Sequence, residues 1–168
     1  MRTRLPRAER ERQMLDTARE LFAARGYADV TMDEVATAVG VTKPLLYTYF
    51  GNKEQLFLAC MKPAGDALLT RVVGAVQSAA DAPEALRSGL HAFFAFLDSD
   101  REAWRVLYDE TLPGSGEIAA RVGEYRARLE SLVTAALREH TESRAVEPLS
   151  VAILGAAEAL ARWWLRTG

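Results

Sequence analysis

The clearest pattern of hydrophobic and polar positions runs from Val30 to Leu56 and predicts two short helices followed by the start of a longer one. Thr31 stands at the expected start of the first helix, and Glu34, three residues later, completes a capping box with it. The segment Gly40–Thr42 then predicts a tight turn, because glycine readily adopts the left-handed conformation that ends helices. Two helices joined by such a turn form a helix-turn-helix.

The second of these short helices has an unusual exposed side. Leu46 and Phe50 lie four residues apart and predict its buried face. The other positions carry an ammonium group, hydroxyls and compact carbon surface: Lys43, Pro44, Tyr47, Thr48 and Tyr49. Such side chains can donate to phosphate oxygens and contact base edges, so we expect this helix to lie against DNA. The alternative is an αα-hairpin whose tyrosines pack on a neighbouring helix.

Helical periodicity continues on both sides of this segment and predicts an all-α fold, with an N-terminal three-helix helix-turn-helix domain and a C-terminal helical ligand-binding and dimerisation domain. The longer predicted helices are Arg7–Arg25, a connecting helix from Asn52 to Ala80, a helix that begins after Asp81, Glu117–His140 and Pro148–Arg166. Pro63 and Gly65 interrupt the connecting helix, so it either kinks near Met61–Gly65 or is two helices.

The last predicted helix is apolar on nearly every side, with Glu158 and Arg162 on its one polar line. A helix with this pattern should be buried all round, and one chain can hardly enclose its terminal helix. We therefore expect a homodimer in which this helix and Glu117–His140 meet a second copy. The expected interface residues are Leu129, Val133, Leu154, Gly155, Leu160, Trp163 and Trp164.

The charge of the chain is close to balanced overall but is unevenly distributed along the sequence. The net charge is −2, which is a poor profile for a protein that coats nucleic acid indiscriminately. Residues 1–12 nevertheless hold five arginines against two glutamates, so a basic end precedes an acidic body. This segment is expected to be a solvated tail, an arm that orders on DNA, or both.

Other features bound the class of protein. No apolar run is long enough to span a membrane without charges, and residues 1–12 lack the apolar core of a signal peptide. The single cysteine, Cys60, cannot form an intramolecular disulfide, so we expect a reduced cytoplasmic protein. A redox-sensing role for Cys60 is the less favoured alternative.

The sequence shows no catalytic constellation, and we expect neither an enzyme nor a metal or cofactor. It lacks a glycine-rich phosphate loop and paired cysteines. His91 and His140 lie on different predicted helices, and His91 is expected to be a partly buried core residue. Asp109 and Glu110 are read as a solvated turn rather than as an acid/base pair.

The segment FAARGYADVTMDEVATAVGVTKPLLYTYFGNKEQLF resembles the DNA-binding domain of the TetR family of one-component bacterial repressors. The resemblance runs from about Arg10 to Phe57 and rests on several fixed spacings at once. They are Gly26-Tyr27, Thr31, Val35-Ala36, Gly40-Val41-Thr42, Leu46-Tyr47, Tyr49-Phe50 and Asn52-Lys53-Glu54. Pro44, Leu45 and Thr48 depart from common family residues, so the operator preference cannot be carried over.

This resemblance implies a repressor with a helix-turn-helix domain over residues 1–52 and a regulatory and dimerisation domain over residues 53–168. It also implies that the connecting helix acts as a lever and that the last two long helices form a four-helix bundle with a partner's. Family members usually carry one more helix after a Trp-rich helix of this kind. The expected groove contacts are Lys43, Pro44, Leu45 and Thr48, and the expected phosphate contacts are Thr31, Thr42, Tyr47, Tyr49 and Lys53.

A small-molecule effector is expected to bind among the middle helices. The candidate pocket residues are Phe93, Phe94, Leu97, Trp104, Tyr108 and Tyr125, which favour a hydrophobic or aromatic effector. Each of them also suits an ordinary core position. Two other hypotheses remain open at this stage: a helical small-molecule-binding or scaffold protein without DNA binding, and an activator rather than a repressor.

Overall fold

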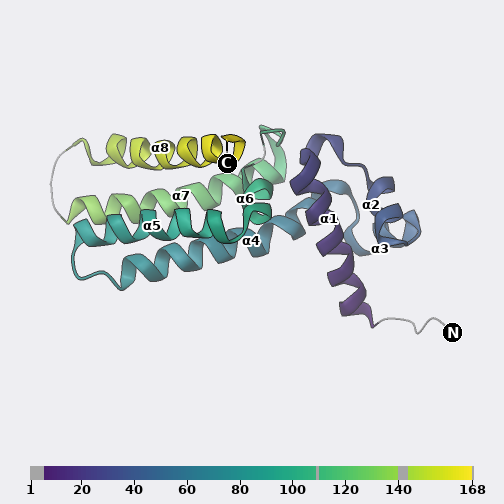
Figure 1. Cartoon of the computed structure of the whole chain (residues 1–168). Helices are drawn as coiled ribbons and strands as arrows, with labels where there is room; N and C mark the ends of the chain where they lie inside the picture. Colours follow the sequence, from purple (N-terminus) through teal and green to yellow (C-terminus); the bar gives the residue numbers. More distant parts are fainter. Residues whose placement is uncertain (1–5, 109, 140–143, 168) are drawn as a thin grey trace. The chain divides into compact units, whose positions relative to one another are not determined.

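The computed structural model describes residues 6–108, 110–139 and 144–167, and every regular element in them is an α-helix (Figure 1). The prediction of an all-α fold is confirmed. In order, the helices are α1 (Arg7–Asp29), α2 (Met32–Val39), α3 (Lys43–Phe50), α4 (Lys53–Gln77), α5 (Ala82–Ser99), α6 (Arg101–Leu107), α7 (Gly116–Arg138) and α8 (Val146–Thr167). Several residues named in the sequence analysis lie outside the described residues. They are Arg2 and Arg4 of the basic segment, Asp109, His140 and Gly168.

The chain divides into two compact units. The N-terminal unit comprises Met1–Ala64 and Glu102–Ala119, and the C-terminal unit comprises Gly65–Arg101 and Ala120–Gly168. α4 is one helix although Pro63 lies inside it, so the alternative of two helices near Met61–Gly65 is wrong. The boundary between the units falls within that same stretch of α4. The predicted domain division at residues 52 and 53 stays a prediction.

The N-terminal unit is built around an aromatic core. The Phe57 ring of α4 meets the rings of Phe22 and Tyr27 edge-on, each at a centroid distance of 5.0 Å. Gly26 turns the chain between those two α1 residues with a φ of 82°, a value that glycine adopts at little cost. This core fixes α1 against α4 and thereby supports α2 and α3, which follow α1 directly.

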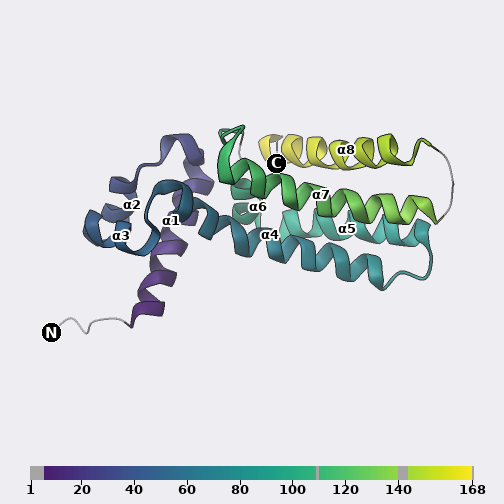
Figure 2. The same cartoon turned by 180° about the vertical axis from the view of Figure 1, so that it is seen from behind.

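The C-terminal unit is a bundle. Figures 1 and 2 show α5, α7 and α8 side by side with the later part of α4. Phe93, Phe96 and Leu97 of α5 are buried, as are Leu129 of α7 and Leu154 of α8. None of the described helices combines the length and the apolar character that crossing a bilayer requires.

Candidate nucleic-acid interface and cavity

The start of α2 is held by a complete capping box. The Glu34 backbone N–H donates to Thr31 Oγ1 at 3.3 Å, and the Thr31 backbone N–H donates to Glu34 Oε2 at 2.8 Å. Arg25 of α1 adds an ion pair, with 2.8 Å between its guanidinium and Glu34 Oε1. The hydrogen bonds from Arg25 and Thr31 lower the pKa of Glu34 to about 2. The predicted cap is thus confirmed, and α1 is tied to it.

The turn between α2 and α3 is set by Gly40. Its φ of 76° and ψ of 35° lie in the left-handed region, and no atom would meet a Cβ there. The Val41 backbone N–H reaches back to the Ala36 carbonyl at 2.9 Å, which satisfies a carbonyl at the end of α2. α3 therefore starts after a short, defined turn, as predicted.

Helix α3 buries Leu46 and Phe50 and exposes the opposite side, as the spacing predicted. Thr42 occupies the N-cap position, but its side chain makes no cap hydrogen bond; its carbonyl instead accepts from the Leu45 and Leu46 N–H groups. Six of the predicted DNA-contact residues are exposed: Thr31, Thr42, Lys43, Pro44, Tyr47 and Thr48. The other three, Leu45, Tyr49 and Lys53, are partly buried.

Lys43 lies in an exposed ion pair with Asp33 of α2, at 2.8 Å between Nζ and Oδ1. The hydrogen bond and the charge of Asp33 raise the pKa of Lys43. Asp33 is not among the predicted site residues, because the pair joins two helices across a turn and no helical periodicity relates the two positions. The pair thus holds the ammonium group of α3 against the carboxylate of α2.

Lys53 is held more tightly than a surface lysine. Its ammonium donates to the Ala28 carbonyl at 3.2 Å and lies 4.4 Å from the centroid of the Tyr27 ring. Partial burial lowers the pKa of Lys53. Lys53 therefore braces the start of α4 against the end of α1, besides offering positive charge beside α3.

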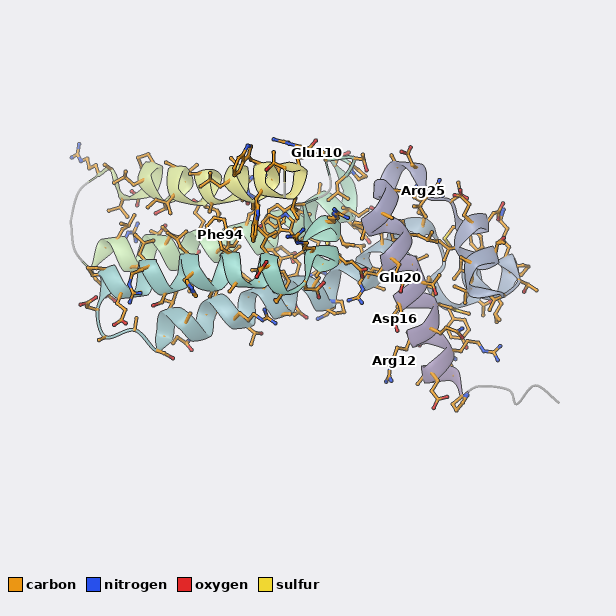
Figure 3. The ribbon with its side chains drawn as sticks, in the orientation of Figure 1. Arg12, Asp16, Glu20, Arg25, Phe94 and Glu110 are labelled. Atoms are coloured by element: carbon orange, nitrogen blue, oxygen red, sulfur yellow. The ribbon has the colours of Figure 1, made fainter. Side chains whose placement is uncertain are left out.

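Part of the basic N-terminal segment belongs to α1. Arg7 and Arg12 are exposed, and the Arg7 guanidinium lies 5.4 Å from the centroid of the Tyr49 ring of α3. Further along α1, Arg12 is followed by two acidic side chains, Asp16 and Glu20, at four-residue intervals (Figure 3). Positive charge thus gathers at the beginning of α1, next to α3.

Cys60 is a poor redox sensor. The thiol is buried and donates to the Leu15 carbonyl across 3.6 Å. Burial raises the pKa of Cys60 to about 12, so its reactive thiolate form is scarce at neutral pH.

The C-terminal unit contains an apolar cavity with about 450 Å³ of empty space, part of it open to solvent. Four helices line it. The lining residues are Val72 and Val76 of α4, Ala85, Leu86, Gly89, Leu90 and Phe93 of α5, Leu129, Leu132, Val133 and Ala136 of α7, and Ile153, Leu154 and Ala157 of α8.

Of the predicted pocket residues, Phe93 alone lines this cavity. Phe94 follows Phe93 in the sequence and is half-buried; Figure 3 labels Phe94 on α5. Trp104 and Tyr108 belong to the N-terminal unit, where their rings stack at 3.8 Å. Leu97 is fully buried, and the Tyr125 hydroxyl donates to Asp66 Oδ1 at 3.0 Å. Five of the six predicted positions therefore lie outside the lining of this cavity, and their part in binding an effector stays a prediction.

The predicted interface residues fall into two groups. Leu129, Val133 and Leu154 line the cavity inside one chain. Leu160 and Trp163 are exposed on α8 by more than half of their surface, while Gly155 and Trp164 are intermediate. Leu149 and Val151 add to the exposed apolar surface of this helix.

Glu158 does not lie on a solvated polar line, contrary to the sequence pattern. Only 3% of its surface is exposed, and its Oε2 lies 2.8 Å from the guanidinium of Arg126 on α7. The partners come from different helices, so sequence spacing could not reveal the pair; the one available signal was a carboxylate inside an otherwise apolar helix.

Comparison with known proteins agrees with this geometry. Residues 14–60 match the family model described as bacterial regulatory proteins of the tetR family. Residues 83–168, half of the chain, match the model described as the tetracyclin repressor-like C-terminal domain. The first match covers the helix-turn-helix, and the second covers α5 to α8, which supply three of the four helices that line the cavity.

Curated relatives include the HTH-type transcriptional activator FasR of Mycolicibacterium smegmatis, which is 38% identical over 119 residues. That match spans 71% of this chain and 54% of the relative. The HTH-type transcriptional regulator BetI of Rhizobium meliloti is 30% identical over 132 residues, 77% of this chain and 64% of the relative. The chain thus spans little more than half to two thirds of the length of these relatives.

Solved structures give the same result over more of the chain. A TetR-like transcriptional regulator from Rhodococcus sp. RHA1 superposes with a TM-score of 0.81 at 35% identity, covering 94% of this chain and 85% of that one. AibR, solved with isovaleryl coenzyme A and operator DNA, superposes with a TM-score of 0.75 at 26% identity, covering 92% and 86%. The chain belongs to the TetR family of DNA-binding transcriptional regulators, which are not enzymes.

Proposed function

We propose that this protein is a homodimeric repressor that binds a palindromic operator and leaves it when an apolar small molecule enters the cavity. The exposed side of α3 is the observation that carries the DNA-binding part. It presents Lys43, Pro44, Tyr47 and Thr48 to solvent, opposite the buried Leu46 and Phe50. A helix that only had to keep the protein soluble would not need these side chains, whereas they suit contact with the major groove of DNA.

Within that surface, we assign sequence reading to the start of α3 and to Thr48. Lys43 can donate to a base edge once it leaves Asp33, and Pro44 and Leu45 offer apolar contact to a thymine methyl group. Thr31, Thr42, Tyr47, Tyr49 and Lys53 are assigned to the phosphate backbone, partly through N–H groups at helix starts. Arg7 and Arg12 add positive charge beside them.

The dimer is proposed from the exposed apolar side of α8. Leu149, Ala152, Ala156, Leu160 and Trp163 follow one another at three- or four-residue steps and are all exposed in the single chain. A stripe with this spacing fits against the same stripe of a second copy, because a two-fold interface must be self-complementary. Two reading heads then call for an inverted repeat in the operator.

The cavity supports an effector that is hydrophobic. AibR, of similar structure, was solved with an acyl-coenzyme A and operator DNA together. Small-molecule sites are lined mainly by apolar side chains, as this cavity is. A regulator of this kind acts where the chromosome is, so we also propose that the protein works in the cytoplasm.

The decisive test is selection from a random-sequence DNA library. We expect an inverted repeat to be enriched by the natural chain and lost with the double variant Lys43→Ala/Tyr47→Ala. The matched control is Arg87→Ala, which removes an exposed cation from α5 and should enrich the same repeat. A single unrepeated site would contradict the dimer, and no enrichment by a folded protein would favour a ligand-binding protein without DNA binding.

An activator is the second candidate, because the relative FasR is named a transcriptional activator. Transcription in vitro distinguishes the activator from the repressor. Transcription in vitro from a promoter that carries the selected operator should fall when the protein is added; a rise would establish activation instead.

A further inference from the structure

The cavity of the C-terminal unit has two chemically different ends. At one end lie Ala85 of α5 and Ala136 of α7, which belong to a cluster of small buried residues with Ala82. At the other end, the last lining residues are Leu129 of α7 and Ala157 of α8. Small buried side chains pack together at the first end, so we expect a ligand to carry any polar group toward the second.

The walls between these ends are aliphatic. Phe93 is the single aromatic residue among the lining, and the lining contains no hydroxyl, amide or charged side chain. Gly89 brings α5 close to α4, since a Cβ there would lie 3.0 Å from Val76 Cγ2. A ligand with polar atoms in this part would lose their hydration without gaining hydrogen bonds, so the part that enters must be a hydrocarbon chain.

The Arg126–Glu158 pair bridges α7 and α8 immediately beyond the second end. Arg126 stands three residues before Leu129, and Glu158 directly follows Ala157. The two charged groups are 2.8 Å apart, with the Glu158 side chain 3% exposed and the Arg126 side chain 49% exposed. One turn of helix therefore separates a buried ion pair from the end of an aliphatic cavity.

A buried carboxylate is a costly feature, and replacing buried ion pairs by apolar residues is often neutral or stabilising. Its place within one helical turn of the residues that line an apolar cavity therefore points to ligand recognition. We infer that the cavity binds an aliphatic chain ending in a carboxylate, and that Arg126 binds this carboxylate in competition with Glu158. This inference rests on the proposed function, for it names the effector class of the same regulator.

The competition follows from charge and geometry. The Arg126 guanidinium has five N–H donors and can bind a carboxylate with two of them in parallel. Glu158 already supplies one carboxylate oxygen at 2.8 Å, so an incoming carboxylate shares or replaces that contact. Neutralising Glu158 should then strengthen binding of the ligand, whereas neutralising Arg126 should weaken it.

Binding of butyrate, hexanoate and octanoate to the full chain tests the aliphatic part by calorimetry without DNA. Affinity should rise up to about fourfold per added methylene group until the cavity is filled. The aromatic comparison is 2-naphthoate. Tighter binding of 2-naphthoate than of octanoate, or affinity that does not grow with chain length, would overturn the inference.

Octanoate and 1-octanol separate the head group from the chain. Arg126→Gln should weaken octanoate binding about tenfold or more and leave 1-octanol unchanged, because it removes a charged hydrogen bond. Glu158→Gln should instead tighten octanoate binding. The matched control is Arg121→Gln, which breaks an ion pair with Glu124 on the same helix and should change neither; the Arg121 and Arg126 side chains are equally exposed, at 48% and 49%.

Equal losses for octanoate and 1-octanol in Arg126→Gln, or weaker octanoate binding in Glu158→Gln, would make the pair purely structural and overturn the inference. Binding of octanoyl-coenzyme A without binding of octanoate would also overturn it, since the thioester lacks the carboxylate. Operator release is measured separately. Octanoate binding without operator release would leave the cavity assignment standing and contradict the effector-released function.

Discussion

At the scale of single residues, the helix-turn-helix depends on a few charged side chains that join its helices. Arg25 reaches the Glu34 carboxylate that caps α2, and Asp33 of α2 reaches Lys43 of α3. Exposed pairs of this kind contribute little to overall stability. Their larger effect is to orient groups: one fixes the start of α2, and the other holds the ammonium group that we assign to the groove.

The capping carboxylate makes a pH-dependent contribution. Glu34 has a folded-state pKa of about 2, below its ordinary 4.5, so its stabilisation is present above about pH 4.5 and is lost as the pH falls through 2. Glu34→Gln should lower the melting temperature at pH 6, with a difference that shrinks toward pH 2.5. Glu20→Gln, at an exposed position on α1, is the control. A difference that stays constant with pH would show that the cap, rather than the charge, matters.

Asp33 should restrain DNA binding. Its carboxylate holds Lys43 and adds negative charge beside α3. Asp33→Asn is therefore expected to raise operator affinity severalfold in a fluorescence-anisotropy titration, most strongly at low salt. Lower affinity would mean that Asp33 is needed to aim Lys43.

At the scale of elements, α4 is shaped by two glycines that have opposite surroundings. A Cβ at Gly65 would lie 2.3 Å from the Tyr125 ring, whereas nothing lies within 4 Å of one at Gly74. The Tyr125 ring cannot move cheaply, because it is buried and its hydroxyl donates to Asp66. Burial and this hydrogen bond raise the pKa of Tyr125 to about 12. Gly65 thus allows α7 to approach α4 closely.

Alanine substitutions at these two positions should have opposite signs. Gly74→Ala is expected to stabilise the protein by about 0.5–1 kcal/mol through helix propensity. Gly65→Ala should destabilise it by about 1–3 kcal/mol, because overpacking outweighs that gain. Urea unfolding of both variants measures the difference. Stabilisation by Gly65→Ala would show that Tyr125 moves aside without cost.

At the scale of the whole molecule, the exposed apolar stripe of α8 departs from the surface of an ordinary monomer. Leu160 and Trp163 are 55% and 57% exposed, on a helix whose other side is buried. The N-terminal unit carries the proposed DNA surface, and the C-terminal unit carries both the cavity and this stripe. The proposed effector site and the proposed dimer interface thus lie in the same bundle.

Charge placed in the stripe should separate two copies. Leu160→Glu/Trp163→Glu is expected to sediment as a monomer and to bind the full inverted repeat at least tenfold more weakly, while contacts to one half-site persist. Ala95→Glu, an exposed position on α5, is the control and should stay dimeric. A double variant that remains dimeric would place the interface elsewhere.

The sequence by itself determined the local structure of the N-terminal part. Caps, the turn glycine and the buried spacing act over three or four residues, so Thr31, Gly40 and the pair Leu46/Phe50 predicted α2 and α3 correctly. The apolar character of α8 was equally visible, although which of its sides is buried inside the chain was not.

Only the tertiary structure decided which residues meet across helices. The predicted pocket selected aromatic residues by type, whereas the cavity is mostly aliphatic because four helix faces of Val, Leu, Ile and Ala converge on it. The burial of Glu158 against Arg126 and the pairing of Asp33 with Lys43 join positions with no helical relation. Such contacts depend on how helices pack, and packing is set by the whole bundle rather than by any one stretch of sequence.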